Sequence, residues 1–188
     1  MTRRLSHVVG FDDAPFDRTH RGDVLVVGAV FSGSRLDGVL SCKVRRDGAN
    51  ATRAIAECAR RSRFYPQLHA VLLQGIAFAG FNVVDIGALH IALRLPVLVV
   101  ARKKPNLAAI RSALLENVRG GVRKWGLIEA AGPMEPMHGL YVQRMGLESA
   151  DARALLERLA VHSAVPEPLR TAHLIASGVT LGESRSRV

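Results

Sequence analysis

The spacing of the first three apolar segments is the feature that most restricts the fold. Residues 5–11 (LSHVVGF), 23–31 (DVLVVGAVF) and 36–44 (LDGVLSCKV) are apolar and rich in β-branched residues, which is typical of strands. Turn-forming residues at 18–22 and 32–34 separate them and leave no room for helices. The chain is therefore expected to begin with an antiparallel meander of three strands.

After this meander the sequence pattern alternates between helices and strands. Asn50 is placed to cap a helix that extends to about Arg63, with an apolar face and an arginine-rich remainder. The expected elements that follow are a strand at 69–73, a helix at about 82–93, a strand at 96–101, a helix from 105 to about 120, a strand at 139–145, and helices at 149–162 and 167–176.

This order predicts an α/β fold with a mixed sheet, in which helix-crossover strands follow the three-strand antiparallel meander. That topology is ribonuclease H-like. A doubly wound, flavodoxin-like sheet is the main alternative, but it requires helices between the first three strands. We expect one domain over 1–188, with a mobile tail at about 181–188.

Composition indicates the cellular compartment in which the protein is expected. The chain is 48% hydrophobic, yet no apolar run has the length of a membrane span, and the N-terminus lacks a signal-peptide pattern. A cytoplasmic protein without a membrane partner is expected. Cys42 and Cys58 have neither CxxC spacing nor a secretory context, so they are predicted to be buried and reduced.

The charge balance favours an anionic partner. The net charge is +10, and only four of the 26 cationic residues are lysines. Arginine binds phosphate oxygens through two parallel hydrogen bonds, which lysine cannot do. An arginine-rich proteome from a GC-rich genome is the alternative explanation. The candidates for phosphate contacts at turns and strand ends are Arg18, Arg21, Arg45, Arg46, Lys103 and Lys104.

Acidic residues mark a candidate metal site. In the expected topology the ends of the first and fourth strands lie side by side, and carboxylates there can share Mg²⁺ or Mn²⁺. Asp12 and Asp13 end the first strand on opposite faces, and Asp12 is the favoured ligand. Asp47 precedes the first helix. Gln74 ends the fourth strand and offers a neutral amide oxygen where a nuclease needs a carboxylate.

The glycine-rich turn after the fourth strand suggests a further role. Phe78 lies within it and is a candidate for stacking on an extruded base, with Tyr65 as a weaker one. The alternative is that both are core residues, which is the more common role of aromatic side chains in a small domain. Asp85 either supports the site from behind the ligands or is a first-turn acid of the next helix.

Five segments resemble the endonuclease dU family, which is related to endonuclease V. The segments are GFDDAPF (10–16), DGANAT (47–52), LLQGIAFAGFNVVDI (72–86), PVLVVARKKPN (96–106) and PEPLRTAHLIASG (166–178). The resemblance spans nearly the whole chain in the expected order. It implies a ribonuclease H-like fold and Mg²⁺-dependent cleavage of DNA at deaminated bases such as deoxyuridine.

The resemblance also implies roles for single residues. Asp12 and Asp47 match the family's acids and would hold the metal, whereas Gln74 and Asn50 stand where the family has aspartate. His173 would contribute to proton transfer or phosphate contact.

Arg170 lies three residues before His173 on the same predicted helix, so the two share a face, and it is a further candidate for phosphate contact.

Three functional hypotheses follow. The first is a metal-dependent endonuclease that acts on DNA at deaminated bases without an organic cofactor. The second is a catalytically weakened relative that binds nucleic acid, because Gln74 and Asn50 each replace a carboxylate by an amide. The third, protein assembly, is less favoured because the charge is so unbalanced. The sequence leaves the oligomeric state open.

Overall fold

The computed structural model describes residues 5–184 and contains a seven-stranded mixed sheet of order β3-β2-β1-β4-β7-β9-β8. The strands are β1 (His7–Asp13), β2 (Asp23–Ser32), β3 (Arg35–Arg45), β4 (Ala70–Gln74), β7 (Val97–Ala101), β8 (Glu135–Met137) and β9 (Leu140–Met145). A separate hairpin joins β5 (Ala77–Phe78) to β6 (Asn82–Val83). Strands β1, β2 and β3 pair antiparallel, as the meander prediction requires.

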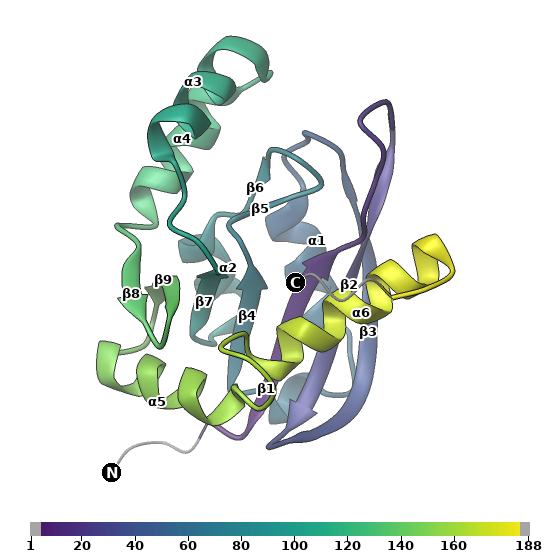
Figure 1. Cartoon of the computed structure of the whole chain (residues 1–188), viewed down its shortest axis with the longest axis vertical. Helices are drawn as coiled ribbons and strands as arrows, with labels where there is room; N and C mark the ends of the chain where they lie inside the picture. Colours follow the sequence, from purple (N-terminus) through teal and green to yellow (C-terminus); the bar gives the residue numbers. More distant parts are fainter. Residues whose placement is uncertain (1–4, 185–188) are drawn as a thin grey trace.

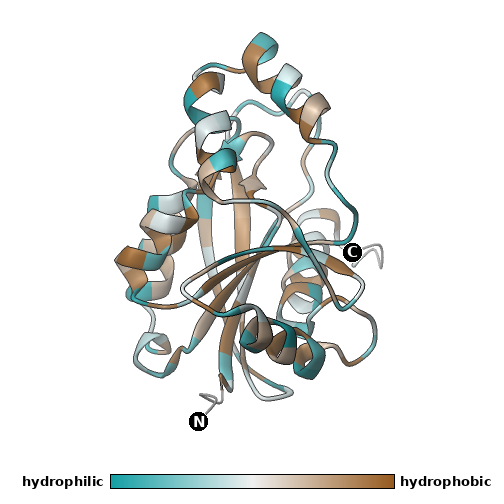
Figure 2. Ribbon diagram, turned by 90° about the vertical axis from the view of Figure 1, so that its left-hand side faces the viewer, coloured by the Kyte–Doolittle hydropathy of each residue, from teal (hydrophilic) through white to brown (hydrophobic). Residues whose placement is uncertain are grey.

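Helices cover both faces of the sheet (Figure 1). Helices α1 (Ala51–Arg60) and α2 (Ile86–Leu93) lie on one face, and α5 (Ser149–Leu159) and α6 (Glu167–Leu181) lie on the other. Helices α3 (Leu107–Asn117) and α4 (Gly121–Ala130) pack against each other and project beyond the sheet. The strands carry the most apolar residues (Figure 2), because the central strands are buried on both faces.

The parallel strands determine where polar residues gather. Strand β1 pairs parallel with β4, and β4 pairs parallel with β7. Their carboxyl ends therefore meet at one edge of the sheet. Asp12, Gln74 and the cationic segment 102–104 all lie at or just beyond these ends. The ribonuclease H-like fold class predicted from the strand order is confirmed by this topology.

Several predicted boundaries were wrong. The helix predicted from about residue 82 begins at Ile86, because Asn82 and Val83 pair with the hairpin strand β5. Asp85 is consequently the N-cap of α2 and its Oδ1 accepts a hydrogen bond from Ala88 N–H (2.8 Å), so it does not lie inside the helix. Asn50 precedes α1, but its side chain makes no capping hydrogen bond to that helix.

Helix α4 was not predicted, because Gly120-Gly121 matches a helix stop. Gly120 does adopt a left-handed conformation (φ 73°) after α3, but the next helix begins at once at Gly121. A Cβ atom at Gly121 would lie only 1.8 Å from the carbonyl oxygen of Leu114, so glycine is required by the close contact of the two helices.

The chain end and the cysteines also differ from expectation. Helix α6 extends to Leu181, and the hydroxyl of Ser184 donates a hydrogen bond to the carbonyl of Leu174 (2.7 Å), so the tail packs on α6 up to this point. The rest of the tail predicted to be mobile, 185–188, lies outside the described residues. Cys42 and Cys58 are unbridged, as predicted, but they are half-buried instead of fully buried.

Candidate active site

Asp12 lies in a buried contact between β1 and α6. It is 4% exposed, and its Oδ2 lies 2.9 Å from Nδ1 of His173. Its Oδ1 accepts a hydrogen bond from the backbone N–H of Asp13 (2.9 Å). Burial raises the pKa of Asp12, while the hydrogen bond and charge of His173 act in the opposite direction. His173 therefore helps to keep a buried carboxylate ionised.

Gln74 lies beside Asp12 in the sheet. The parallel register pairs Phe11 with Leu73, so Asp12 and Gln74 are the next residues on neighbouring strands, and their side chains point to the same face. The amide oxygen Oε1 of Gln74 is buried and has no hydrogen-bond partner among the described residues. A buried acceptor without a partner is costly, so this oxygen is available for a ligand that the protein alone does not provide.

Asp13 and Asp47 both bind the backbone of Ala79 or its neighbours on the β5–β6 hairpin. Asp13 Oδ2 accepts from Ala79 N–H (2.7 Å), while Asp47 N–H donates to the Ala79 carbonyl (2.9 Å) and Asp47 Oδ1 accepts from Phe81 N–H (2.8 Å). Asp47 and Ala79 both have positive φ values, 51° and 48°, which are rare for residues other than glycine. These hydrogen bonds join the turn at Asp47 to the β5–β6 hairpin and hold both residues in an unfavourable backbone conformation.

The environment of Asp13 makes it hard to ionise. Burial, followed by the charge of neighbouring Asp12, raises the pKa of Asp13 to about 6. The structure thus brings Asp12, Gln74 and His173 together. Asp47, predicted as a metal ligand with Asp12, instead lies with Asp13 at the hairpin, where Phe81 N–H and Arg46 Nε (3.3 Å) contact its carboxylate.

Asn50 and Asn82 connect the turn before α1 to the hairpin. Asn50 Oδ1 accepts from Arg45 N–H (3.0 Å) and from Asn82 Nδ2 (2.8 Å). Asn82 is fully buried, and its Oδ1 also accepts from Ala51 N–H (3.0 Å). Asn82 was not predicted as a site residue, and the one local signal for it is its position as the polar residue before the apolar pair 83–84.

The structure overturns the stacking role suggested for Phe78. Its side chain is fully buried in the main core, so no base can reach its ring. The alternative, a core role, is the one the structure supports, because the β5–β6 hairpin folds back on the core. The weaker candidate, Tyr65, is half-buried, and its hydroxyl donates a hydrogen bond to the carbonyl of Leu93 at the end of α2 (2.7 Å). This contact ties the ring to α2 and not to the glycine-rich turn.

The cationic candidates fall into two groups. The exposed ones are Arg18, Arg21, Arg45, Lys103 and Lys104. Arg46 instead directs Nη1 at the carbonyls of Arg18 (2.5 Å) and His20 (2.6 Å), which commits it to holding the 18–22 turn.

Arg170 is half-buried, and its Nε lies 3.0 Å from Glu167 Oε1 within the same helix. Neutralisation by this carboxylate reduces its attraction for phosphate.

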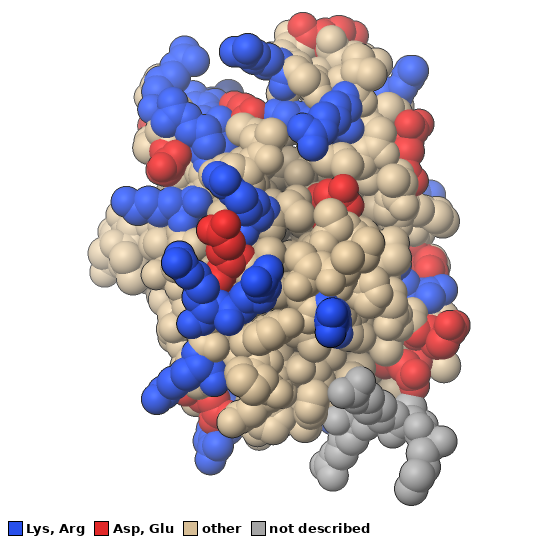
Figure 3. All heavy atoms as spheres, turned by 180° about the vertical axis from the view of Figure 1, so that it is seen from behind, with Lys and Arg blue, Asp and Glu red and all other residues tan. Residues whose placement is uncertain are grey.

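A cavity that the sequence did not reveal opens beside Asp47. It has a volume of about 630 Å³, and Lys124 of α4 forms part of its wall. Lys124 is 5% exposed and donates from Nζ to the Asp47 carbonyl (2.5 Å); burial lowers its pKa, against the charge of Asp47. The other cationic residues of the wall are Arg53, Arg60, Arg119 and Arg123. Lys and Arg side chains gather over one half of the face shown in Figure 3.

The residues at the sheet edge fit a hard divalent cation. Asp12 supplies a carboxylate and Gln74 a buried, unpartnered carbonyl oxygen, and both are ligand types that Mg²⁺ accepts. Within residues 5–184, no three His, Cys, Asp or Glu side chains are grouped closely enough to form a metal site by themselves. Water and substrate phosphate would therefore have to supply most of the coordination, which is usual for Mg²⁺.

Comparison with known proteins agrees with this architecture. The chain is 60% identical over 181 residues to a UPF0215 protein of Deinococcus radiodurans, covering 96% of this chain and 92% of that protein. A crystal structure of a protein of unknown function from Archaeoglobus fulgidus superposes with a TM-score of 0.86 at 33% identity, covering 92% of this chain and 97% of the other.

More distant structures share the fold. Endonuclease V of Ciona intestinalis, in complex with a 24mer DNA containing an inosine followed by a ribo-adenosine, superposes with a TM-score of 0.60 at 12% identity, over 95% of this chain and 87% of the other. No helix within residues 5–184 is long and apolar enough to cross a bilayer. The family model for endonuclease dU matches residues 4–180, and the chain therefore belongs to the endonuclease dU family.

Proposed function

We propose that this protein is a divalent-metal-dependent endonuclease that cuts DNA at or near deaminated bases such as deoxyuridine. Membership of an endonuclease family and the fold shared with endonuclease V support a nuclease. The observation that carries the proposal is the cluster of Asp12, His173 and Gln74, in which a buried carboxylate and an unpartnered amide oxygen meet at the carboxyl ends of two parallel strands.

Each residue has a distinct task in this proposal. Asp12 and Gln74 would hold Mg²⁺ or Mn²⁺, whereas Asp47 would hold the hairpin through its contacts with Phe81 N–H and Arg46. A bound metal supplies an activated water and stabilises charge on the phosphate oxygens. His173 directs Nδ1 at Asp12, so an ionised Asp12 keeps the proton on Nδ1 and fixes the orientation of the ring.

A catalytically weakened, DNA-binding relative is the second candidate, and Gln74 favours it. An amide at this position lacks the negative charge that would offset a divalent cation. The exposed cations would still bind the phosphate backbone in such a protein.

A cleavage assay separates the two candidates. The substrates are deoxyuridine- and deoxyinosine-containing DNA in Mg²⁺ or Mn²⁺, and the proteins are the natural chain, Gln74→Asp and Gln74→Asp with Asn50→Asp. Cutting by the natural chain that chelation abolishes supports the endonuclease. Binding without cutting, followed by gain of cutting in Gln74→Asp, selects the binding module.

Asn50→Asp is the matched control, since Asn50 lies in backbone contacts and not beside Asp12 in the sheet. We expect it to add nothing to the effect of Gln74→Asp. The absence of both binding and cutting in all variants would contradict both candidates.

A further inference from the structure

A second cavity lies immediately beside the Asp12–Gln74 edge. It has a volume of about 570 Å³, within the usual range of small-ligand pockets, and it begins at Gly75, the residue after Gln74. Its walls come from the β5–β6 hairpin, the segment after β7, helices α3 and α4, and strand β9. The residues that matter for its chemistry are Gly75, Phe81, Trp125, Gly132, Met134 and Gln143.

Gln143 is the polar feature of this largely apolar cavity. It is 3% exposed, and its Nε2 donates a hydrogen bond to the carbonyl of Gly132 (2.7 Å). Because that carbonyl can only accept, the orientation of the amide is fixed. The opposite end, Oε1, is buried and has no hydrogen-bond partner among the described residues.

Such an unpartnered acceptor is rare in this protein. In the described part of the chain, four buried side-chain atoms have no hydrogen bond. Two are Nε atoms of Arg46 and Arg144, and each lies within 3.3 Å of a carboxylate oxygen in an ion pair. The other two are the amide oxygens of Gln74 and Gln143. Since burying an acceptor without a donor costs free energy, the oxygen of Gln143 calls for a hydrogen-bond donor from a ligand.

Deamination creates such a donor in a nucleobase. Cytosine N3 and adenine N1 are acceptors, whereas the corresponding atoms of uracil and hypoxanthine carry a proton. An acceptor fixed in an apolar pocket favours the N–H form and disfavours the parent base, whose ring nitrogen would face another lone pair. A site of this kind discriminates strongly, because the wrong base leaves buried polar groups unpaired.

We propose that this cavity receives the extruded target base and that Gln143 Oε1 accepts the ring N–H of a deaminated base. The inference rests on the proposed function, to which it adds the residue that reads the base. Phe81 and Trp125 are half-buried in the cavity wall and offer ring faces for stacking, the part first suggested for Phe78.

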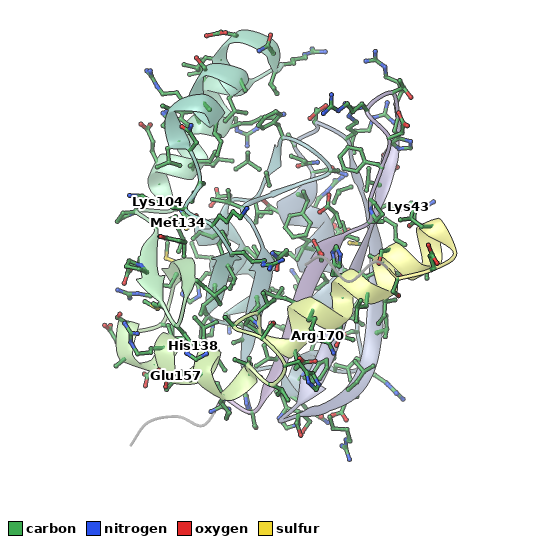
Figure 4. All side chains as sticks on the ribbon, in the orientation of Figure 1. Lys43, Lys104, Met134, His138, Glu157 and Arg170 are labelled. Atoms are coloured by element: carbon green, nitrogen blue, oxygen red, sulfur yellow. The ribbon has the colours of Figure 1, made fainter. Side chains whose placement is uncertain are left out.

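The position of the cavity suits a substrate that is cut at Asp12. Gly75 lines the cavity and directly follows Gln74 of the metal-binding edge, so an extruded base in the cavity would leave the phosphates of its own strand near that edge. Lys104 follows β7 next to Pro105 of the cavity wall, and it lies near Met134, another wall residue, in Figure 4. Its exposed ammonium group is available to a backbone phosphate.

Binding to single-stranded DNA without metal tests the proposal, because it needs no cleavage. The probe oligonucleotides contain only deoxyadenosine and deoxycytidine around one central nucleotide, since guanine and thymine also carry a ring N–H. The central nucleotide is deoxyuridine, deoxycytidine or N3-methyldeoxyuridine, which lacks the N–H. Affinity is measured by fluorescence anisotropy in EDTA.

We expect the natural chain to bind the deoxyuridine probe roughly 5- to 100-fold more tightly than the other two, the range of one well-made base contact. Gln143→Leu should remove this preference and leave the affinity for the deoxycytidine probe unchanged. Gln67→Leu, at an exposed glutamine outside the cavity, should change neither value.

The outcomes distinguish the two proposals. Equal binding of deoxyuridine and N3-methyldeoxyuridine by the natural chain overturns the role of Gln143 without depending on any variant. A uracil preference that survives in folded Gln143→Leu, checked by circular dichroism, also overturns it while the nuclease proposal stands. No measurable binding of any probe by the natural chain overturns the proposed function together with this inference.

Discussion

The carboxyl group of Asp12 illustrates how single residues are arranged at this site. It is almost fully buried, yet it faces His173 and the N–H of Asp13, which both favour its ionised form. Burial is the largest cause at both residues, but at Asp13 the charge of Asp12 adds to it and raises the pKa to about 6. Burial therefore raises the pKa of both carboxyl groups, and His173 offsets part of that rise at Asp12 alone.

Removal of His173 should change the pH dependence of cleavage. Since His173 lowers the pKa of Asp12, His173→Ala should raise it, and the acid limb of the pH–rate profile should move to higher pH. Exposed His162 provides the matched control, and His162→Ala should leave the profile unchanged. If the His173→Ala variant is slower by the same factor at every pH, with no shift of the acid limb, then His173 does not act by lowering the pKa of Asp12.

Asp13 should make the metal-free protein less stable as the pH rises. A folded-state pKa of about 6, against 3.8 for an unperturbed aspartate, means that the stabilising contribution of Asp13 is complete below pH 3.8 and is lost as the pH rises through 6. Ionisation then costs at most about 3 kcal/mol.

The measurement is urea unfolding at pH 4 and pH 7 in EDTA for the natural chain and Asp13→Asn. Asparagine keeps an acceptor for Ala79 N–H but does not titrate. The free energy of unfolding should drop less in the variant between the two pH values. Identical drops in both proteins would show that Asp13 does not carry the effect.

At the scale of elements, helix α6 determines where His173 lies. The helix packs directly on β1 at Gly10, where a Cβ atom would come within 2.6 Å of the Pro168 backbone. Strand β1 carries Asp12 two residues later, so the close contact sets the distance between the carboxylate and the imidazole. Glycine is needed here for the approach of the helix and not for an unusual backbone angle.

We expect Gly10→Ala to destabilise the protein by roughly 1–3 kcal/mol, the usual cost of overpacking, and to reduce cleavage by moving α6 from β1. Urea unfolding and the cleavage assay measure the two effects. Gly126→Ala is the control, since no atom lies within 4 Å of a Cβ there and alanine favours helix. It should be neutral or stabilise by up to about 1 kcal/mol; equal losses in both variants would refute the role given to the α6–β1 contact.

Over the whole molecule, net charge and topology act together. The +10 charge attracts polyanions in general, but the parallel order of β1, β4 and β7 brings the 102–104 segment to the edge that carries Asp12 and Gln74. Lys103 and Lys104 are therefore positioned for substrate phosphates. Cationic residues on distant elements contribute only to the general field.

DNA affinity should fall steeply with salt, because bound phosphates release counterions. Lys103→Gln with Lys104→Gln should reduce the slope of log affinity against log salt by about 2. Arg61→Gln with Arg153→Gln, at exposed sites on other elements, should leave the slope nearly unchanged. If both pairs of substitutions reduce the slope equally, the net charge of the protein decides DNA affinity and the position of Lys103 and Lys104 does not.

The strand order and the polar residues at strand ends were accessible from local patterns. Three apolar segments without intervening helices specify a meander, and alternation places Asp12 and Asp13 on opposite faces, as the structure has them. Helix α4 and the β5–β6 hairpin were not predicted, because a glycine pair resembles a stop signal and two-residue strands have no periodicity to detect.

The sequence by itself determined the fold class, the family resemblance and the residues at the sheet edge, because strand periodicity and strand-end residues are local properties of the chain. Only the tertiary structure decided that Phe78 is core, that Arg46 binds carbonyls of its own chain, and that Gln143 and Trp125 line a cavity beside Gln74. Burial and unsatisfied hydrogen-bonding capacity depend on segments far apart in the sequence, and no local pattern records which of them will meet.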